Sequence, residues 1–100
     1  MILDTLKSDL YEAQKAKQAL KVSVVRYLLA DIKNKEIELR PLHQEVTDEI
    51  IVKLLRKQVK KRSEVIEEFA KAGRQDLVDK ETAELEIVKD YLSRFDNETQ

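Results

Sequence analysis

The sequence predicts an all-α protein, a four-helix antiparallel arrangement of two helical hairpins with a long third helix. Three observations support this fold class. The 100 residues include one glycine and one proline, which leaves few positions for turns. Apolar side chains recur about every 3.6 residues, the period of a helix, and no segment keeps the alternating pattern of a strand. A chain of this length is expected to form one domain.

The first two predicted helices cover residues 2–17 and 20–39. The first has one apolar side, with acidic residues early and lysines late, an order that complements the helix dipole. The second is apolar on nearly all sides, which predicts that it is the most buried of the helices. Pro41 ends it, because the residue before a proline avoids the α region.

The third predicted helix covers residues 48–72. The fourth begins at Arg74 or Gln75 and ends at Leu92, and its inward side carries Leu77, Val78, Leu85, Val88 and Leu92. Thr47 is suited to cap the start of the third helix, and Gly73 is suited to the position just after its end. Because only Gly73 breaks the helical pattern here, the two helices should fold back as a tight antiparallel hairpin. Residues 93–100 are polar and are expected to fray, so we predict a helical domain of residues 1–92 followed by a polar tail.

Composition excludes several classes of function. The 19 basic and 20 acidic residues nearly cancel, so the chain as a whole has no charge that attracts nucleic acid or an anionic membrane. The absence of cysteine excludes disulfides, thiolate metal sites and cysteine nucleophiles. No apolar run approaches the ~20 residues that span a bilayer, and the N-terminus lacks the core of a signal peptide. We therefore expect a cytoplasmic protein with no membrane partner and no cofactor.

Catalytic and metal-binding patterns are weak. His43 is the one histidine, and Glu45 lies two residues away, a pair that could act as a general base. No motif places a nucleophile beside them, so we interpret His43 as a solvated loop residue. The Glu-x-x-His pattern of di-metal helical bundles is missing. The sequence therefore predicts no catalytic residue and no metal site.

Charged residues fall on the apolar side of three predicted helices, or on its flank. An isolated buried charge is very costly, whereas a paired and hydrogen-bonded one is tolerated. We therefore predict an inter-helix ion network whose acceptors are Glu36 and Glu81 and whose donors are Arg26, Arg62 and Arg74. In one interpretation the network fixes the register of the helices, and in the other it lines a polar cleft for a ligand.

The opposite side of the third helix is basic. The segment KLLRKQVKKR, residues 53–62, contains six basic residues and no acid. Five of these residues are candidates for binding the phosphates of a nucleic acid: Lys53, Arg56, Lys57, Lys60 and Lys61. Glutamates that follow within two turns offer i, i+4 partners, and no aromatic residue is interleaved for base stacking. A solvated charged surface is the alternative interpretation.

The segment EEFAKAGRQDLVDKETAELEIVKDYL, residues 67–92, closely resembles the YqeY family, which is related to the tail of the amidotransferase subunit GatB. The segment SVVRYLLADIKNKEIE, residues 23–38, resembles the first-hairpin segment of the family around Arg26. The matching positions in the first segment are Phe69, Ala72, Gly73, Arg74, Asp76, Leu77, Val78, Lys80, Glu81, Glu84, Leu85, Tyr91 and Leu92.

The resemblance implies an all-α bundle followed by a small three-helix domain. The family usually continues with a proline after the tyrosine–leucine pair, but Ser93 follows here, so we expect the second domain to be absent. GatB takes part in the glutamine-dependent amidation of mischarged tRNA, a carbon–nitrogen ligase reaction, and its tail resembles a tRNA-contacting rather than a catalytic module. The resemblance thus implies a non-catalytic tRNA-binding or adaptor module whose partner is tRNA or an amidotransferase-related protein.

An alternative function is a protein-interaction or structural helical module with no role in nucleic-acid binding. The broad apolar surface predicted for residues 20–39 motivates it, because four helices need not cover every side. A homo-oligomer would be one form of this alternative. A third alternative is an enzyme in its own right, since the family carries an amidotransferase-related label, although the sequence shows no nucleophile–base pair and no metal set.

Overall fold

The computed structural model describes the backbone of residues 1–99 and the side chains of residues 1–96. The described chain contains four α-helices, one short 3-10 helix and no strand, so the all-α prediction is confirmed. The elements in order are α1 (Ile2–Lys15), α2 (Ala19–Leu39), η1 (Arg40–Leu42), α3 (Asp48–Lys71) and α4 (Gln75–Thr99). None of these helices is long and apolar enough to cross a lipid bilayer.

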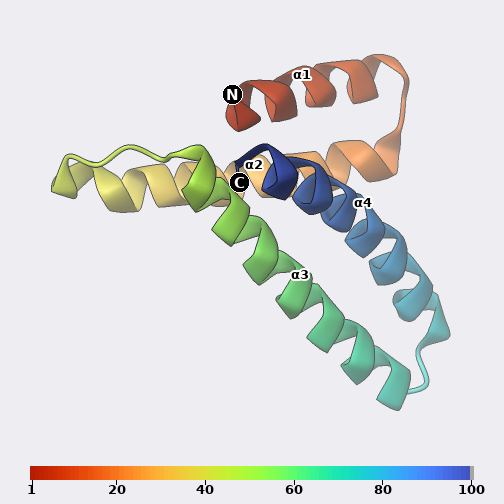
Figure 1. Cartoon of the computed structure of the whole chain (residues 1–100). Coiled ribbons are helices and arrows are strands. Elements are labelled where there is room, and N and C mark those ends of the chain that lie inside the picture. Colours follow the sequence, from red (N-terminus) through yellow and green to blue (C-terminus); the bar gives the residue numbers. More distant parts are fainter. Residues whose placement is uncertain (100) are drawn as a thin grey trace.

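The helices form two hairpins that cross (Figure 1). α1 and α2 make the first hairpin, and α3 and α4 make a longer one whose closed end projects away from it. α3 packs along α4, while α2 contacts both of them and α1 contacts α2 and α3. The projecting part of the second hairpin is therefore only two helices thick, and apolar side chains such as Phe69 and Leu77 remain half-buried there.

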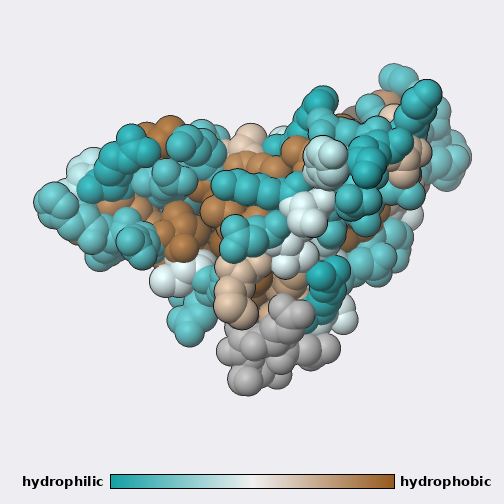
Figure 2. All heavy atoms as spheres, turned by 90° about the horizontal axis from the view of Figure 1, so that it is seen from above, coloured by the Kyte–Doolittle hydropathy of each residue, from teal (hydrophilic) through white to brown (hydrophobic). Residues whose placement is uncertain are grey.

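The hydrophobic core lies where the two hairpins cross. Every α-helix contributes to one cluster of buried side chains: Ile2, Leu6, Val24, Val25, Leu28, Ile32, Ile51, Val52, Leu55, Val88, Tyr91 and Phe95. α2 faces this core with one side, so some of its other apolar residues, among them Tyr27 and Ile37, stay exposed. From above, hydrophilic residues cover most of the visible surface, with hydrophobic residues showing in patches between them (Figure 2).

Three residues in the left-handed conformation, Lys17, His43 and Gly73, follow the ends of α1, η1 and α3. Gly73 has φ of 71°, and the backbone amides of Gly73 and Arg74 donate to the carbonyls of Ala70 and Phe69 at 3.1 and 3.0 Å. This Schellman motif satisfies carbonyls at the end of α3, and the predicted glycine stop is confirmed. Lys17, with φ of 55°, ends α1 in the same way, so this helix stops at Lys15 rather than continuing to residue 17.

The start of α3 and the connection before it also follow local signals. The Thr47 side chain accepts a hydrogen bond from the Ile50 amide at 3.2 Å, which confirms the predicted N-cap. α2 ends at Leu39, and Pro41 lies within η1, which closes on His43 with φ of 56°. The Asp48 carboxylate, at the first turn of α3, accepts from the Ile2 amide at 3.2 Å and so ties α3 to the start of α1.

The C-terminal segment is part of the fold. α4 continues without interruption from Gln75 to Thr99, and Phe95 is 1% exposed, with its ring stacked on Tyr91 at a centroid distance of 5.5 Å. The prediction that a fraying tail begins after Leu92 is wrong, because the apolar spacing of Val88 and Tyr91 continues to Phe95. Residue 100 lies outside the described residues.

A buried hydroxyl joins the last helix to the first. Tyr91 donates to Asp9 Oδ2 at 2.6 Å, linking α4 to α1. Burial, together with this hydrogen bond to a carboxylate, raises the pKa of Tyr91 well above its usual value near 10. The folded protein therefore keeps the Tyr91 proton at an alkaline pH at which the unfolded chain loses it.

This shift predicts a pH-dependent effect of Tyr91→Phe. At pH 7 the variant should be less stable by about 1–2 kcal/mol, because it loses a hydrogen bond to a carboxylate. Above pH ~10 the unfolded wild-type chain ionises at Tyr91, which favours unfolding, so the advantage of the wild type should shrink. Urea denaturation of both proteins from pH 7 to pH 11 measures the difference, and the other tyrosines cancel because both proteins contain them. A difference that stays constant over this range would contradict the prediction.

Candidate functional site

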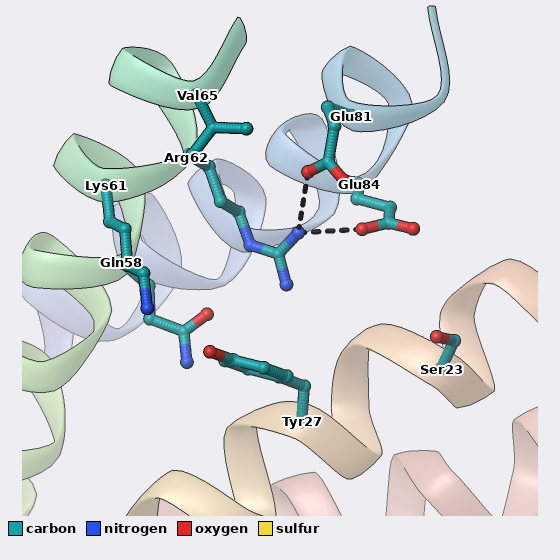
Figure 3. A pocket seen from close by; sticks show the side chains of 8 residues that line it. All are labelled: Ser23, Tyr27, Gln58, Lys61, Arg62, Val65, Glu81 and Glu84. Atoms are coloured by element: carbon teal, nitrogen blue, oxygen red, sulfur yellow. Dashed lines mark hydrogen bonds and ion pairs between the residues drawn. The ribbon is translucent and has the colours of Figure 1, made fainter. Parts of the chain in front are cut away.

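A polar cleft lies where α2, α3 and α4 meet (Figure 3). Its volume is about 260 Å³. α2 supplies one wall, the middle of α3 a second and the middle of α4 a third. The lining residues are Ser23, Tyr27, Gln58, Lys61, Arg62, Val65, Glu81 and Glu84. We call this feature the polar cleft.

Arg62 is the centre of the polar cleft. Its Nη1 atom donates to Glu84 Oε2 at 2.7 Å and lies 3.5 Å from Glu81 Oε2, so one nitrogen joins α3 to two carboxylates on α4. The side chains of Arg62 and Glu84 are each 12% exposed, and that of Glu81 is 23% exposed. On the α2 side, the Arg62 guanidinium carbon lies 5.3 Å from the centre of the Tyr27 ring, a cation–π contact. The predicted pair of Arg62 with Glu81 is thus present, and Arg62 contacts three helices.

Gln58 extends this polar arrangement into the core. Its Nε2 atom donates to Asp31 Oδ2 at 3.3 Å, which connects α3 to α2 and orients the amide. Gln58 Oε1 and Arg62 Nε are both buried without a hydrogen-bond partner in the described part of the chain. Figure 3 shows the Gln58 oxygen on the side of the amide that faces Arg62. The polar cleft therefore keeps one unpaired acceptor and one unpaired donor. Leaving such groups buried without a partner costs free energy, and in native proteins it calls for an explanation such as a functional role.

Glu36 and Arg74, two other members of the predicted network, pair locally instead. Glu36 lies 3.4 Å from both Lys33 Nζ and Arg40 Nη2, and the Lys33 hydrogen bond is the main reason that its pKa is lowered. Arg74 pairs with Asp76 at 3.1 Å, and this hydrogen bond lowers the pKa of Asp76. The prediction that these two residues point inward is wrong: the Glu36 side chain is 45% exposed near the end of α2, and Arg74 lies in the turn before α4.

Arg26 also lies outside the network. Its side chain is exposed beside a second hollow, which the α1–α2 turn helps to form. The position of Arg26 on the flank of the apolar side, rather than within it, explains why it does not turn inward. The prediction that it donates to an inward carboxylate is therefore wrong.

Glu84 is the partner of Arg62 that the sequence reasoning missed. It lies one turn after Glu81 on the same side of α4, and its 2.7 Å contact is the shorter of the two. A signal was present: Glu84 shares a helix side with Val88, Tyr91 and Phe95. The inward side predicted for this helix contains neither Tyr91 nor Phe95, so the prediction leaves Glu84 outside that side.

The five candidate phosphate-binding residues all lie exposed on α3, where four share one side of the helix and Lys61 lies at the edge of that side, toward the polar cleft. We call Lys53, Arg56, Lys57, Lys60 and Lys61 the basic strip. Arg56 forms an ion pair with Asp96 on α4. The four lysines make no salt bridge with any carboxylate of residues 1–96. Lys61 also lines the polar cleft, so the basic strip and the cleft meet at this residue.

The polar cleft and the basic strip carry groups that can bind a ligand. Within the described residues, no group of three or more histidine, cysteine, aspartate and glutamate side chains is arranged to hold a metal ion. His43 lies exposed at the end of η1 and does not line the polar cleft, and its backbone conformation closes that short helix. The polar cleft offers carboxylates, an amide, a guanidinium and a phenol ring, which are groups that recognise hydrogen-bonding ligands.

Comparison with known proteins finds relatives that are similar in sequence and about twice as long as this chain. A protein of Lachancea thermotolerans named "Altered inheritance of mitochondria protein 41, mitochondrial" is 40% identical over 90 residues, which cover 90% of this chain and 47% of that protein. The protein of the same name in Eremothecium gossypii is 43% identical over 90 residues, covering 88% and 47%. The one in Saccharomyces cerevisiae is 36% identical over 90 residues, covering 90% and 48%. The chain thus spans about half the length of these curated relatives.

The names of these relatives correct one prediction. Each is called a mitochondrial protein, which contradicts the cytoplasmic localisation expected from the sequence. The family match agrees with the resemblance seen in the sequence, because the family model described as "Yqey-like protein" matches residues 3–97. With nearly the whole chain matched, this protein belongs to the family of YqeY-like proteins.

Proposed function

We propose that this chain is a non-catalytic tRNA-binding or adaptor module that contacts the phosphate backbone of the RNA through the basic strip on α3. The observation that carries the proposal is the state of the four lysines in the strip. They are exposed and unpaired with the carboxylates of residues 1–96, so they can exchange solvent counterions for phosphates at little cost. The likeness of the family to the tail of an amidotransferase subunit points to tRNA as the RNA.

The geometry of the strip suits a nucleic-acid backbone. From Lys53 to Lys61 a helix rises about 12 Å, enough to meet successive phosphates of one strand. α3 is packed against α4 and against the core, so the strip is a fixed surface rather than a mobile tail. The formal net charge of the chain is only −1, so the attraction is local to α3 and should be sensitive to salt.

A gel-shift titration of purified tRNA over a series of salt concentrations tests the proposal. Binding should weaken as salt rises, and each phosphate contact should contribute about 0.7–0.9 to the slope of log K against log salt. The double variant Lys57→Ala/Lys60→Ala removes two contacts, so its slope should be smaller by roughly 1.5. Both residues are exposed, so the fold should be retained.

Lys71→Ala is the matched control. Lys71 lies on the same outward side of α3, but it is separated from the strip by Glu64, Glu67 and Glu68. Its removal should leave the slope unchanged. The proposal fails if tRNA does not bind at low salt, or if the double variant binds with the same salt slope as the wild type.

A further inference from the structure

The basic strip and the polar cleft form one continuous surface at Lys61. From this juxtaposition we propose that the polar cleft receives an unpaired nucleobase of the RNA whose phosphates lie on the basic strip. This inference rests on the proposed function and names the part of the RNA that the site recognises. Its basis is the size, charge and side-chain chemistry of the polar cleft.

The polar cleft has the size and charge for a base rather than a whole nucleotide. Its volume of about 260 Å³ lies just below the ~300 Å³ at which small-molecule pockets begin. Among its lining residues, the positive charges of Lys61 and Arg62 are balanced by Glu81 and Glu84. A neutral base can enter such a cleft without repulsion, whereas a phosphate is drawn more strongly to the basic strip, where no acidic residue interrupts the lysines.

Tyr27 supplies the aromatic surface for a base. It reaches the polar cleft from α2 and is 49% exposed, so part of its ring is open to stacking. The Arg62 guanidinium lies against the ring and holds it in position, with 5.3 Å between its central carbon and the ring centre. Unpaired bases of RNA commonly stack on aromatic side chains and on arginine planes. Tyr27 therefore provides the aromatic group that is missing from the α3 sequence itself.

The polar groups of the cleft favour a base that carries an amino group. Arg62 contacts the Oε2 atoms of both Glu81 and Glu84, which leaves the two Oε1 atoms as acceptors. The unpaired carbonyl of Gln58, a residue only 5% exposed, adds another acceptor on the floor of the cleft. Carboxylates accept hydrogen bonds from the N4 amino group of cytosine. Uracil has a carbonyl oxygen at that position, which a carboxylate repels, so cytosine should be preferred to uracil.

The test measures binding of the whole chain to labelled oligo(C), to oligo(U) of equal length and to an RNA duplex, by fluorescence anisotropy over a salt series. Oligo(C) should bind more tightly than oligo(U). Tyr27→Ala should weaken oligo(C) binding by roughly 5- to 100-fold, the range found when a base loses its aromatic platform. Its salt slope and its affinity for the duplex should not change, because no phosphate contact is removed. Tyr27→Phe keeps the ring and should bind oligo(C) like the wild type.

The outcomes separate this inference from the proposed function. Suppose that the wild type binds the RNAs with a salt slope set by the basic strip, but Tyr27→Ala binds oligo(C) as tightly as the wild type. The polar cleft then does not hold a base, and the proposed binding of RNA through the basic strip is retained. Equal affinity of the wild type for oligo(C) and oligo(U) would overturn the amino-group preference. If none of the three RNAs binds at low salt, the proposed function fails and this inference fails with it.

Discussion

Phe95→Ala is expected to lower the free energy of unfolding by about 3–5 kcal/mol, the usual cost of removing a phenylalanine from a packed core. Phe95 is 1% exposed and belongs to the cluster that includes Ile2 and Leu6 from α1. It also stacks on Tyr91, so the substitution removes an aromatic pair as well as apolar burial. A domain of this size is stable by only about 5–15 kcal/mol, so the variant should unfold at a much lower urea concentration.

Urea denaturation followed by circular dichroism measures the loss, with Ser93→Ala as the control. Ser93 is exposed two residues earlier on the same helix, and its substitution should change stability by no more than ~0.5 kcal/mol. If Phe95→Ala costs less than about 1 kcal/mol, the last turns of α4 do not pack on the core, and the boundary at Leu92 would be correct after all.

The second large effect is expected for Arg62→Ala. Its removal leaves Glu81 and Glu84 largely buried without their shared guanidinium, and α3 loses its charged link to α4. Breaking a fully buried pair costs about 3–5 kcal/mol, and because Glu81 can gain some solvent we expect about 2–4 kcal/mol here. The loss includes the contact with Tyr27, which depends on the same guanidinium.

Two further variants test whether the loss of stability in Arg62→Ala comes from the unpaired carboxylates. Arg26→Ala removes an exposed arginine from α2 and should cost less than ~0.5 kcal/mol. The triple variant Arg62→Met/Glu81→Leu/Glu84→Leu replaces the ions by apolar groups and should recover most of the stability, since no unpaired charge remains. An Arg62→Ala protein as stable as the Arg26→Ala protein would show that the network does not hold the helices together.

Local signals explain what could be predicted from the sequence. Thr47 and Gly73 act through the backbone within a few residues of themselves, so the start and end of α3 and the tight turn to α4 could be predicted. The pair of Arg62 and Glu81 could also be predicted, because each residue interrupts the apolar side of its own helix and a buried charge requires a partner.

The errors have physical causes of two kinds. The predicted inward side of the last helix runs through Leu92, whereas the buried side contains Tyr91 and Phe95. This one difference accounts for both the unpredicted packing of Phe95 and the unpredicted inward position of Glu84. The second cause is that periodicity gives the side of a helix on which a residue lies, but not which turns of that helix are covered by a neighbouring helix. Glu36 lies on a suitable side of α2, but it is in the last turn of that helix and remains half-exposed.

Tyr27 illustrates a third limit, since its role depends on how two hairpins cross. It is 35 positions before Arg62 in the sequence, and nothing in its own helix indicates that a guanidinium will lie over its ring. The same holds for the contact of Tyr91 with Asp9. Such contacts follow from tertiary packing, and one sequence alone does not specify them.

The hydrogen bonds that join α1 to α3 and to α4 have a consequence for the synthesis of the chain. Hydrogen bonds connect Ile2 with Asp48 and Asp9 with Tyr91, pairs that are 46 and 82 positions apart. While the chain is being made, the first hairpin leaves the ribosome before α3 and α4, so Ile2 and Leu6 can pack only against α2 until Phe95 has passed the exit tunnel. The nascent chain therefore completes its core late, and until then its apolar surfaces are accessible to chaperones and to other unfinished chains.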